Sequence, residues 1–566
     1  MRHLLLATAA IALLAACSGG DTQKAANAPA KTEAAAAPAV ASHDELVAMR
    51  AKFADIDMNP DTSFLTDEQR EVVNLLNQAA NLMSEIYLRQ KSEDNPAIRE
   101  KIVSSDVADK DLLLSLFDIN FGPWDALGHD KPFYGDEKLP AGAGFYPTDM
   151  TKAEFEGWIA DHPDDEAAFK SGYTVIRRDE NGGLTAIPYS VYYKQWLEPA
   201  AALLKKAADI TTNASLKKFL TLRAEAFLTD DYYESEMAWM DLDGPIEVAI
   251  GPYEVYTDNL YGYKTAFEAF VTVKNPEESA ALAKYKDFLR DMEGNLPVDD
   301  SYKNFNRGFE SPIAVTAQVH GGGDNAAAVQ TVAFNLPNDE RVREAKGAKK
   351  VLLSNVLDAK FTRILEPMAE HVLEPDQASL LVKKYMGLET LFHELSHSMG
   401  PGTITKDGRE TTVGAELKEL YPATEEGKAD VMGAYNILYM MERGELPASE
   451  KESFLSTYFV GLFRAMRFGT NEAHGRGAAF QYRYFRNAGA AEWDAQAKRF
   501  TIDFPKLEQA IRDLVHDVVV IQGDGDYDAA REFLDTTAVL DDPAKEVIAS
   551  LSDLPVDIAP HYPDKI

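Results

Sequence analysis

Two histidines four residues apart, with a glutamate directly after the first, stand in residues 388–402, "LETLFHELSHSMGPG". On a helix, residues i and i+4 lie one turn apart on the same face, so His393 and His397 can direct ring nitrogens at one point. Glu394 lies about 100° further round the helix, where it can reach a water on a bound metal. This spacing suits zinc. The motif alone leaves open the alternative of two structural histidines on an amphipathic helix.

A catalytic zinc site needs a third protein ligand and an open fourth position. The segment 424–445 predicts a second helix with Thr424 as its N-cap. Glu426 and Asp430 share one face of this helix, so Glu426 can bind the metal while Asp430 accepts the free ring N–H of a zinc-bound histidine. The candidate ligands are therefore His393, His397 and Glu426.

Small side chains, Gly433 and Ala434, lie on the same face and allow close approach to another helix. Glu425 is assigned with Asp430 to the carboxylates that support the ligands. Acidic residues also favour the first turn of a helix, so Glu425 and Glu426 alone would be read as residues at a helix N-terminus. The preceding His-Glu-x-x-His motif favours the metal site.

Such a site, with one zinc per chain, predicts hydrolysis. The metal would lower the pKa of a water toward neutrality, Glu394 would accept its proton as it attacks a carbonyl, and the metal would stabilise the oxyanion. Peptide hydrolysis is the reaction class that most often uses this set of residues.

Helices must position this chemistry. Apolar residues at helical spacing, ended by Gly-Pro, predict the histidine helix over 381–400. Other helical patterns lie at 66–90, behind Thr66 as a cap, at 195–230, at 276–294 and through much of 350–540. Strand-like alternation is concentrated at 246–257, 267–274, 313–320 and 329–337. We therefore expect a mainly helical α+β fold in which the chain crosses more than once between a helical part and a β-containing part.

Composition excludes one class of partner. The chain of 566 residues carries a formal net charge of −35 with a sequence pI near 4.7, and this charge opposes binding to a nucleic-acid backbone. Nothing in the sequence indicates an oligomeric state.

The N-terminus, "MRHLLLATAAIALLAACSGG", has the charged, apolar and small-residue regions of a secretory leader, and its end resembles a bacterial lipobox. We expect residues 1–16 to be a signal peptide and Cys17, the only cysteine, to be lipidated. Residues 17–43 then form a flexible tether, and Ser18 favours the periplasmic face of an outer membrane over other destinations. A plain signal peptide is the alternative. The lipid would be the only membrane anchor.

Several separate stretches together resemble the dipeptidyl peptidase III family of zinc exopeptidases. They are the histidine helix and residues 251–271, 334–339, 425–430 and 472–489. The resemblance implies that Tyr256 and His474 stabilise the transition state beside the base Glu394. It also implies that the α-amine of a peptide is held by Glu254, Asn335 and Asn338, with Glu268 as a weaker candidate.

The same resemblance implies two lobes around a wide cleft, a helical zinc-binding lobe and a lobe with a β-barrel core. The expected boundaries are 44–274 with 306–350 for the substrate-side lobe, and 275–305 with 351–566 for the catalytic lobe. The metal motif has the five-residue form, one residue shorter than in the best-known members, and a C-terminal portion of longer relatives is expected to be missing. From the residues alone, Tyr256 reads as core or rim, and Asn335 and Asn338 read as turn residues around Pro337.

Other chemistries have less support. The sequence has no Nudix pattern, which argues against pyrophosphate hydrolysis, and no Gly-x-Ser-x-Gly elbow to accompany the glycine-rich "HGGGDN" at 320–325. We expect that stretch to be a loop offering backbone edges to a peptide. The predicted activity is release of dipeptides from the N-termini of short peptides. The alternatives are a peptide-binding lipoprotein without turnover and a zinc aminopeptidase or endopeptidase with a different cleavage register.

Overall fold

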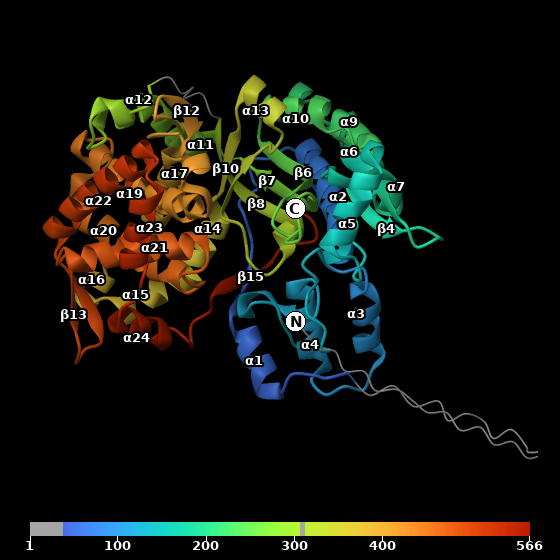
Figure 1. Ribbon diagram of the computed structural model, residues 1–566, viewed down its shortest axis with the longest axis horizontal. Helices are drawn as coiled ribbons and strands as arrows, with labels where there is room; N and C mark the ends of the chain where they lie inside the picture. The colour runs from blue at the N-terminus through green and yellow to red at the C-terminus, as the bar shows by residue number, and fades with distance from the viewer. Residues whose placement is uncertain (1–37, 275, 306–311) are drawn as a thin grey trace, which may run out of the picture. The chain divides into compact units, whose positions relative to one another are not determined.

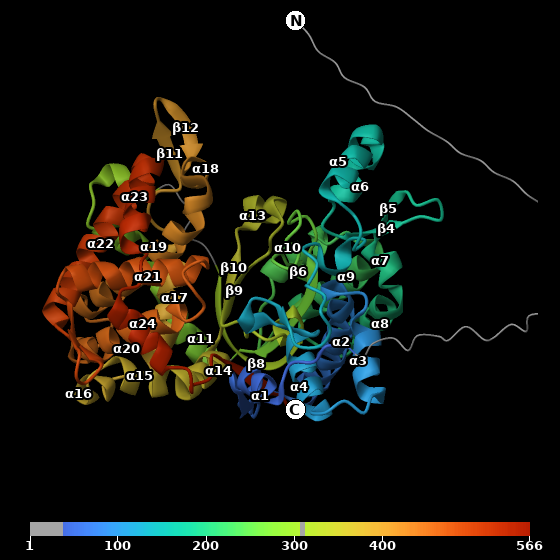
Figure 2. The ribbon, with the colours of Figure 1, turned by 60° about the horizontal axis from the view of Figure 1, so that its bottom comes forward.

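The computed structural model describes residues 38–274, 276–305 and 312–566. The expected signal peptide, Cys17 and most of the tether lie outside the described residues. Residues 39–566 form one compact unit with two lobes (Figure 2). No helix among the described residues is long and apolar enough to cross a membrane.

One lobe is built on a five-stranded sheet (Figure 1). Its strands, in spatial order, are β6 (Ile246–Glu254), β7 (Ala266–Val273), β8 (Ile313–Gly323), β10 (Lys349–Leu353) and β9 (Ala333–Leu336). Neighbouring strands are antiparallel except for the parallel pair β8 and β10. The side chains of β6 and β7 are buried along their whole length, so the sheet lies inside its lobe. The four strand-like segments are thus confirmed, with β9 shorter than its segment.

Helix α2 (Asp67–Lys91) packs against β7 and β8, and α8 (Lys194–Ile210) packs against α2 and α9 (Ala214–Thr229). Thr66 caps α2 as predicted, in a capping box with Gln69. The glycine-rich stretch at 320–325 belongs largely to β8 and is not a free loop. A side chain at Gly322 would stand 2.2 Å from the carbonyl oxygen of Ala80 in α2, so glycine is required where the strand meets the helix.

The other lobe is helical. Its central helices are α17 (Lys383–Ser396), α19 (Tyr421–Glu442), α20 (Lys451–Met466), α21 (Ala473–Asn487) and α22 (Phe504–Asp524). Helix α19 packs against α17, α21 and α22, and so lies at the centre of this lobe. The hairpin of β11 (Thr403–Lys406) and β12 (Arg409–Thr412) extends from it (Figure 2).

The remaining elements surround these two groups. Around the sheet lobe lie α1 (His43–Ala51), α3 (Asn95–Ser104), α4 (Lys110–Asn120), α5 (Lys152–Asp161), α6 (Glu166–Lys170), α7 (Tyr189–Tyr192), α10 (Tyr233–Met240), α13 (Glu340–Lys346), and the pairs β2 (Trp124–Asp125) with β3 (Lys131–Pro132) and β4 (Thr174–Arg178) with β5 (Leu184–Pro188). The helical lobe adds α11 (Pro276–Ala283), α12 (Leu289–Asn295), α14 (Ser354–Lys360), α15 (Glu366–Val372), α16 (Pro375–Ala378), α18 (Val413–Leu417), α23 (Tyr527–Thr537), α24 (Asp542–Ser550), and β13 (Ala491–Asp494) with β14 (Arg499–Ile502).

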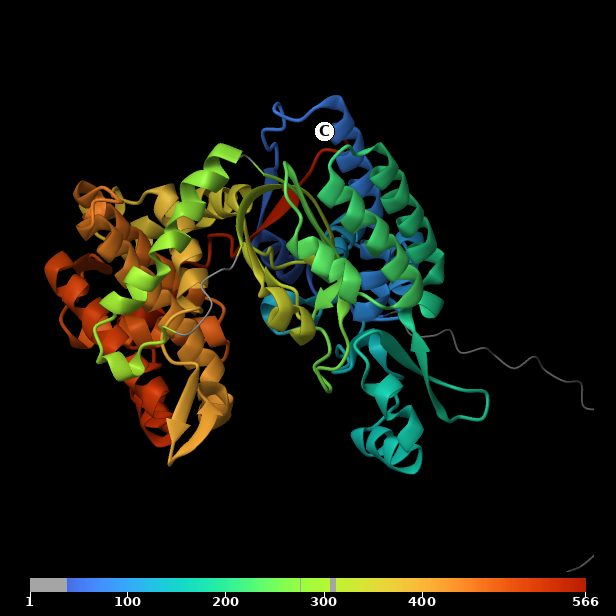
Figure 3. The same cartoon turned by 90° about the horizontal axis from the view of Figure 1, so that it is seen from above.

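The C-terminal strand β15 (Asp557–His561) returns to the N-terminal part of the chain, where it pairs in parallel with β1 (Phe53–Asp57). Figure 3 shows this red strand beside blue N-terminal segments. A buried ion pair at 2.9 Å joins Asp557 to Lys360 of α14. The last strand within the range 351–566 is therefore paired with the N-terminal part of the chain.

The predicted mainly helical α+β fold with two lobes is confirmed. The β core differs from the expected β-barrel. Within the described residues it is an open sheet with β6 and β9 at its edges. Strand β9 has only four residues and ends before Pro337, so it offers little backbone for a further pairing.

Candidate active site

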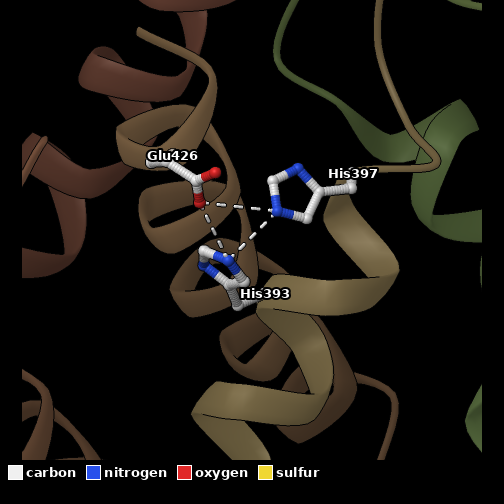
Figure 4. A group of neighbouring side chains, drawn as sticks. All are labelled: His393, His397 and Glu426. Carbon is white, nitrogen blue, oxygen red and sulfur yellow. Dashed lines mark hydrogen bonds and ion pairs between the residues drawn. The ribbon is translucent and has the colours of Figure 1, made fainter. Parts of the chain in front are cut away.

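The two histidines of α17 and Glu426 of α19 converge on one point (Figure 4). His393 Nε2 lies 3.1 Å from His397 Nε2, because the two rings project from successive turns of one helix. Glu426 Oε2 lies 3.3 Å from His393 Nε2 and 3.6 Å from His397 Nε2. The structure thus brings together the three ligands predicted from the sequence.

A carboxylate holds the far side of each ring. Asp430 Oδ1 lies 2.6 Å from His393 Nδ1, and Glu425 Oε1 lies 2.9 Å from His397 Nδ1. A carboxylate only accepts hydrogen bonds, so each Nδ1 is assigned as the N–H and each Nε2 keeps its lone pair for the shared point. Both orienting residues belong to α19, the helix that also carries Glu426.

The charges on α19 are stabilised locally. Burial opposes ionisation of Glu425, but Lys428, 3.0 Å away, and His397 outweigh it and lower the pKa of Glu425 to about 2. Burial likewise opposes ionisation of Glu426, while His393 and His397 hold the pKa of its carboxyl well below the usual range. Both carboxylates are therefore ionised at neutral pH.

The three donor atoms fit a zinc ion. Zinc binds nitrogen and oxygen at about 2.0–2.2 Å, so two donors of a tetrahedral site stand about 3.3–3.6 Å apart. Two of the observed separations, 3.3 and 3.6 Å, fall in this range, and the third, 3.1 Å between the two histidines, is slightly shorter. The buried Glu426 Oε2 makes no hydrogen bond within the described residues beyond its ion-pair contacts with histidines, and a metal would satisfy it.

Close helix packing makes this geometry possible. A Cβ atom at Gly433 of α19 would lie 3.0 Å from the backbone nitrogen of His393 in α17. The buried Ala434 lies beside it. The small residues singled out in the sequence therefore lie where α19 crosses the histidine helix.

The predicted catalytic residues lie around this point. Glu394 is half-buried on α17, next to the ligand His393. His474, in the first turn of α21, places Nδ1 3.4 Å from Glu426 Oε2, and its side chain is 65% exposed. Tyr256, just beyond β6, is 83% exposed. Although the residue is largely exposed, neighbouring atoms partly desolvate the Tyr256 phenol and raise its pKa, and the charges of Glu426 and Glu254 add to the rise, so the tyrosine is within electrostatic reach of both groups.

Three carboxyl groups gather on the sheet lobe. Burial raises the pKa of Glu254 to about 7, and neighbouring Asp324 adds to the rise. Burial, Asp324 and Glu254 together raise the pKa of Glu268 well above its usual value. Glu254 and Glu268 are both 8% exposed, on adjacent strands that pair antiparallel. The buried Lys91 is a basic neighbour of Asp324 and Glu254, and this acidic cluster of Glu254, Glu268 and Asp324 would be stabilised by a further cation.

The two amide candidates differ in their contacts. Asn335 of β9 has a buried Oδ1 without a hydrogen-bond partner in the described part of the chain. Asn338 instead donates through Nδ2 to the carbonyl of Tyr253 at 2.8 Å and so ties its turn to the end of β6. Glu254 is also engaged: its carboxylate accepts from the amides of Tyr256 and Thr257 and orders that loop.

Asp324 was not among the candidates from the sequence. It follows the glycine stretch and begins a short 3₁₀ turn at the end of β8. No sequence signal marked it, because the contact depends on strand register: Gly323 pairs with Glu268, which places the next residue near that carboxylate.

Comparison with known proteins identifies the family. The chain is 52% identical to dipeptidyl peptidase III from Caldithrix abyssi, whose structure superposes with a TM-score of 0.89 over 91% of this chain and 98% of that one. The sequence profile of peptidase family M49 matches residues 153–413. The chain belongs to this family. The dipeptidyl peptidase III of Corallococcus sp. strain EGB is 37% identical, with a TM-score of 0.81 over 92% of this chain and 98% of that one.

Nudix hydrolase 3 of Arabidopsis thaliana is 34% identical over 90% of this chain and 73% of its own length. Its name denotes a chemistry for which this sequence carries no pattern. Membership of family M49, together with the His-His-Glu group, makes the protein a metallopeptidase, as the sequence predicts.

Proposed function

We propose that the protein is a zinc-dependent exopeptidase that releases dipeptides from the N-termini of short peptides. The observation that carries the proposal is the triangle of His393, His397 and Glu426, in which carboxylates fix both rings. A zinc ion held there supplies a Lewis acid that polarises a substrate carbonyl and lowers the pKa of a water.

The protein's own residues complete the reaction. Glu394 accepts a proton from the attacking water and returns it to the leaving amine. Tyr256 and His474 donate hydrogen bonds to the carbonyl oxygen as it becomes negative. Both are exposed enough to meet a substrate, and both lie within electrostatic reach of Glu426.

The acidic cluster and Asn335 supply the cleavage register. Glu268, Glu254 and the buried Asn335 Oδ1 attract the ammonium of a peptide N-terminus, which limits how much chain reaches the metal site. Asn338 acts on this subsite through its bond to Tyr253, holding the turn after β9 against β6.

The test is digestion of defined peptides followed by mass spectrometry, with the parent and with Glu394→Gln. We expect dipeptides from the parent, their loss after chelation and their return with zinc, and no turnover by the zinc-loaded variant. Turnover by that variant at the parent rate would refute the mechanism. Single amino acids or internal fragments would favour the aminopeptidase or endopeptidase alternative, and binding without cleavage would favour the peptide-binding one.

We also propose that Cys17 is lipidated and anchors the protein in the cell envelope, facing the periplasm from the outer membrane. The lipobox-like sequence before Cys17 supports this. Cys17→Ala is expected to release the protein from the membrane fraction and to abolish incorporation of labelled fatty acid. An unchanged membrane fraction would contradict the proposal.

A further inference from the structure

A buried lysine on an inner strand of the sheet contacts the last turn of the histidine helix. Lys350 lies in β10, and its backbone pairs with Ile313 of β8 on one side and with Asn335 of β9 on the other. Its Nζ donates to the backbone carbonyl of Glu394 and to Ser398 Oγ at 2.9 Å. Lys350 is 3% exposed. Figure 1 places β10 next to α17.

The end of α17 makes this carbonyl available. In a regular helix the Glu394 carbonyl would accept from the amide of Ser398. Here that amide donates to Leu395 at 3.0 Å, and the amide of Met399 donates to Ser396 at 3.1 Å, because the chain tightens into i−3 bonds. The Glu394 carbonyl is thus left for Lys350. A cation at the C-terminal end of a helix is also favoured by the helix dipole.

The contacts of Lys350 Nζ with Glu394 and Ser398 lie next to the proposed metal ligands. Glu394 and Ser398 each follow one of the two histidines and are four residues apart, so they share one face of the turn. Holding both fixes how this turn, and the Glu394 side chain on it, is rotated relative to the sheet. Because β10 is paired on both sides, the lysine extends from an anchored strand.

We propose that Lys350 is a positioning residue that sets where the Glu394 carboxylate lies relative to the substrate-binding strand β9. Its backbone partner in β9 is Asn335, which carries the unpartnered buried Oδ1. Lys350 therefore links Asn335, a candidate for binding the peptide amine, to the helix turn that carries the general base Glu394. The proposal rests on the proposed function, in which Glu394 is the general base. Misplacing a reacting group by about 1 Å costs about 100-fold in rate.

The test compares Lys350→Met, Ser398→Ala and the double variant, with Lys383→Met as the matched control. Lys383 lies at the other end of α17 and is paired with Asp358 at 2.8 Å on the surface. We expect Lys350→Met to lower kcat about tenfold or more, with KM and zinc content within about threefold of the parent. Ser398→Ala should cause a smaller loss, and the double variant should be no worse than Lys350→Met because both changes break one connection.

Hydrogen exchange gives a readout independent of turnover. The backbone amides of residues 394–399 should exchange faster in Lys350→Met and Ser398→Ala, and at the parent rate in Lys383→Met. An unchanged kcat in zinc-loaded Lys350→Met, or a kcat loss that only follows lost zinc, would overturn the inference. If Lys350→Met does not fold, unchanged kcat and exchange in Ser398→Ala overturn it.

The variant Glu394→Gln distinguishes failure of the proposed function from failure of the proposed role of Lys350. Turnover by this variant would remove the proposed function itself. An inactive Glu394→Gln beside a fully active Lys350→Met would remove only the role of Lys350.

Discussion

Asp430→Asn is a nearly isosteric change whose effect on the metal site follows directly from two hydrogen bonds. Asp430 Oδ1 accepts from His393 Nδ1 at 2.6 Å, and Oδ2 accepts from Gln481 Nε2 at 3.2 Å. Asparagine offers one acceptor oxygen and one NH₂ group, which only donates. Whichever way its amide turns, the NH₂ group faces either the ring N–H of His393 or the amide N–H of Gln481, so one bond becomes a donor–donor contact.

The expected loss of metal affinity follows from this geometry. Removing the hydrogen-bond partner of a metal-bound histidine typically costs about 10–100-fold in metal affinity, or about 1.4–2.7 kcal/mol. His393 is only 9% exposed, so water cannot easily replace the lost acceptor. The bond is also short and charge-assisted. Asparagine either turns its NH₂ group toward His393 or offers it a neutral oxygen while opposing Gln481, so we expect a loss within that range, about 10–100-fold.

Competition with a chelator of known zinc affinity measures this loss directly. Asp535→Asn, on the exposed face of α23, removes the same charge far from the ligands and should leave the affinity unchanged. Activity of Asp430→Asn should largely return at saturating zinc, because Glu394 is untouched. A zinc affinity within twofold of the parent would refute the assignment of Asp430 as the group that orients His393.

Three further predictions follow from the packing and the charges. Gly433→Ala places a Cβ 3.0 Å from the His393 backbone nitrogen, so we expect α19 to shift, a loss of about 1–3 kcal/mol in urea unfolding, and weaker zinc retention. Burial raises the pKa of Glu254 to about 7, so this carboxyl becomes charged as the pH rises through 7, whereas a peptide amine loses its proton near pH 8. We therefore expect kcat/KM to peak between pH 7 and pH 8. Glu254→Gln should flatten the fall of kcat/KM on the acidic side of this peak. The unfolded carboxyl ionises near 4.5, so this group also makes the free energy of unfolding fall as the pH rises from 4.5 to 7. Asp557→Asn leaves the Lys360 ammonium buried without its carboxylate partner and should lower the free energy of unfolding, measured with urea, by about 3–5 kcal/mol at pH 6. Burial already lowers the pKa of Lys360 to about 8, so the lysine is largely neutral at pH 9 and the loss should be smaller there.

Features that depend on neighbouring residues could be predicted from the sequence. Thr66 caps α2 by accepting a hydrogen bond from the backbone amide of Gln69, only three residues later in the chain. The histidines of the α17 motif share a face because of helix geometry alone. The ligand Glu426 could be placed because its helix repeats the same spacing with Asp430. These predictions required no knowledge of how distant segments pack.

The predicted start of α19 was wrong. The helix begins at Tyr421 with Pro422 in its first turn, and Thr424 lies inside it, its hydroxyl bonded to the carbonyl of Leu420 at 3.1 Å. Proline at the first helical positions was the stronger signal. Glu425 and Glu426 consequently lie beyond the first turn, where the helix N-terminus contributes little, and the histidines and Lys428 account for their ionisation.

Contacts between distant strands could not be predicted in this way. Alternation assigns Lys349 and Lys350 to opposite faces of β10, but only the packed structure shows that Lys349 pairs with Glu247 while Lys350 reaches α17. Asp324 joins Glu254 and Glu268 for the same reason, through the register of β7 and β8. Register depends on the whole sheet.

The carboxyl groups of the two lobes are prepared for different partners. Basic neighbours lower the pKa of Glu425 to about 2, so the metal side is charged before substrate arrives. Burial and the neighbouring Asp324 raise the pKa of Glu254 to about 7, so a cation that arrives there stabilises the ionised form of this carboxyl. A free peptide N-terminus brings that cation, and an N-acetylated peptide does not.

Acetylation of the same peptide should therefore lower kcat/KM about 100-fold or more, since a neutral amide brings no positive charge to Glu254 and Glu268. Replacing Glu268 by Gln should reduce this discrimination, because one of the carboxylates that favours the ammonium is gone. The measurement is the ratio of kcat/KM for free and acetylated peptides in each variant. Equal cleavage of both peptides by the parent would show that the cluster does not select the N-terminus, and the cleavage register would then have to come from the metal side of the site.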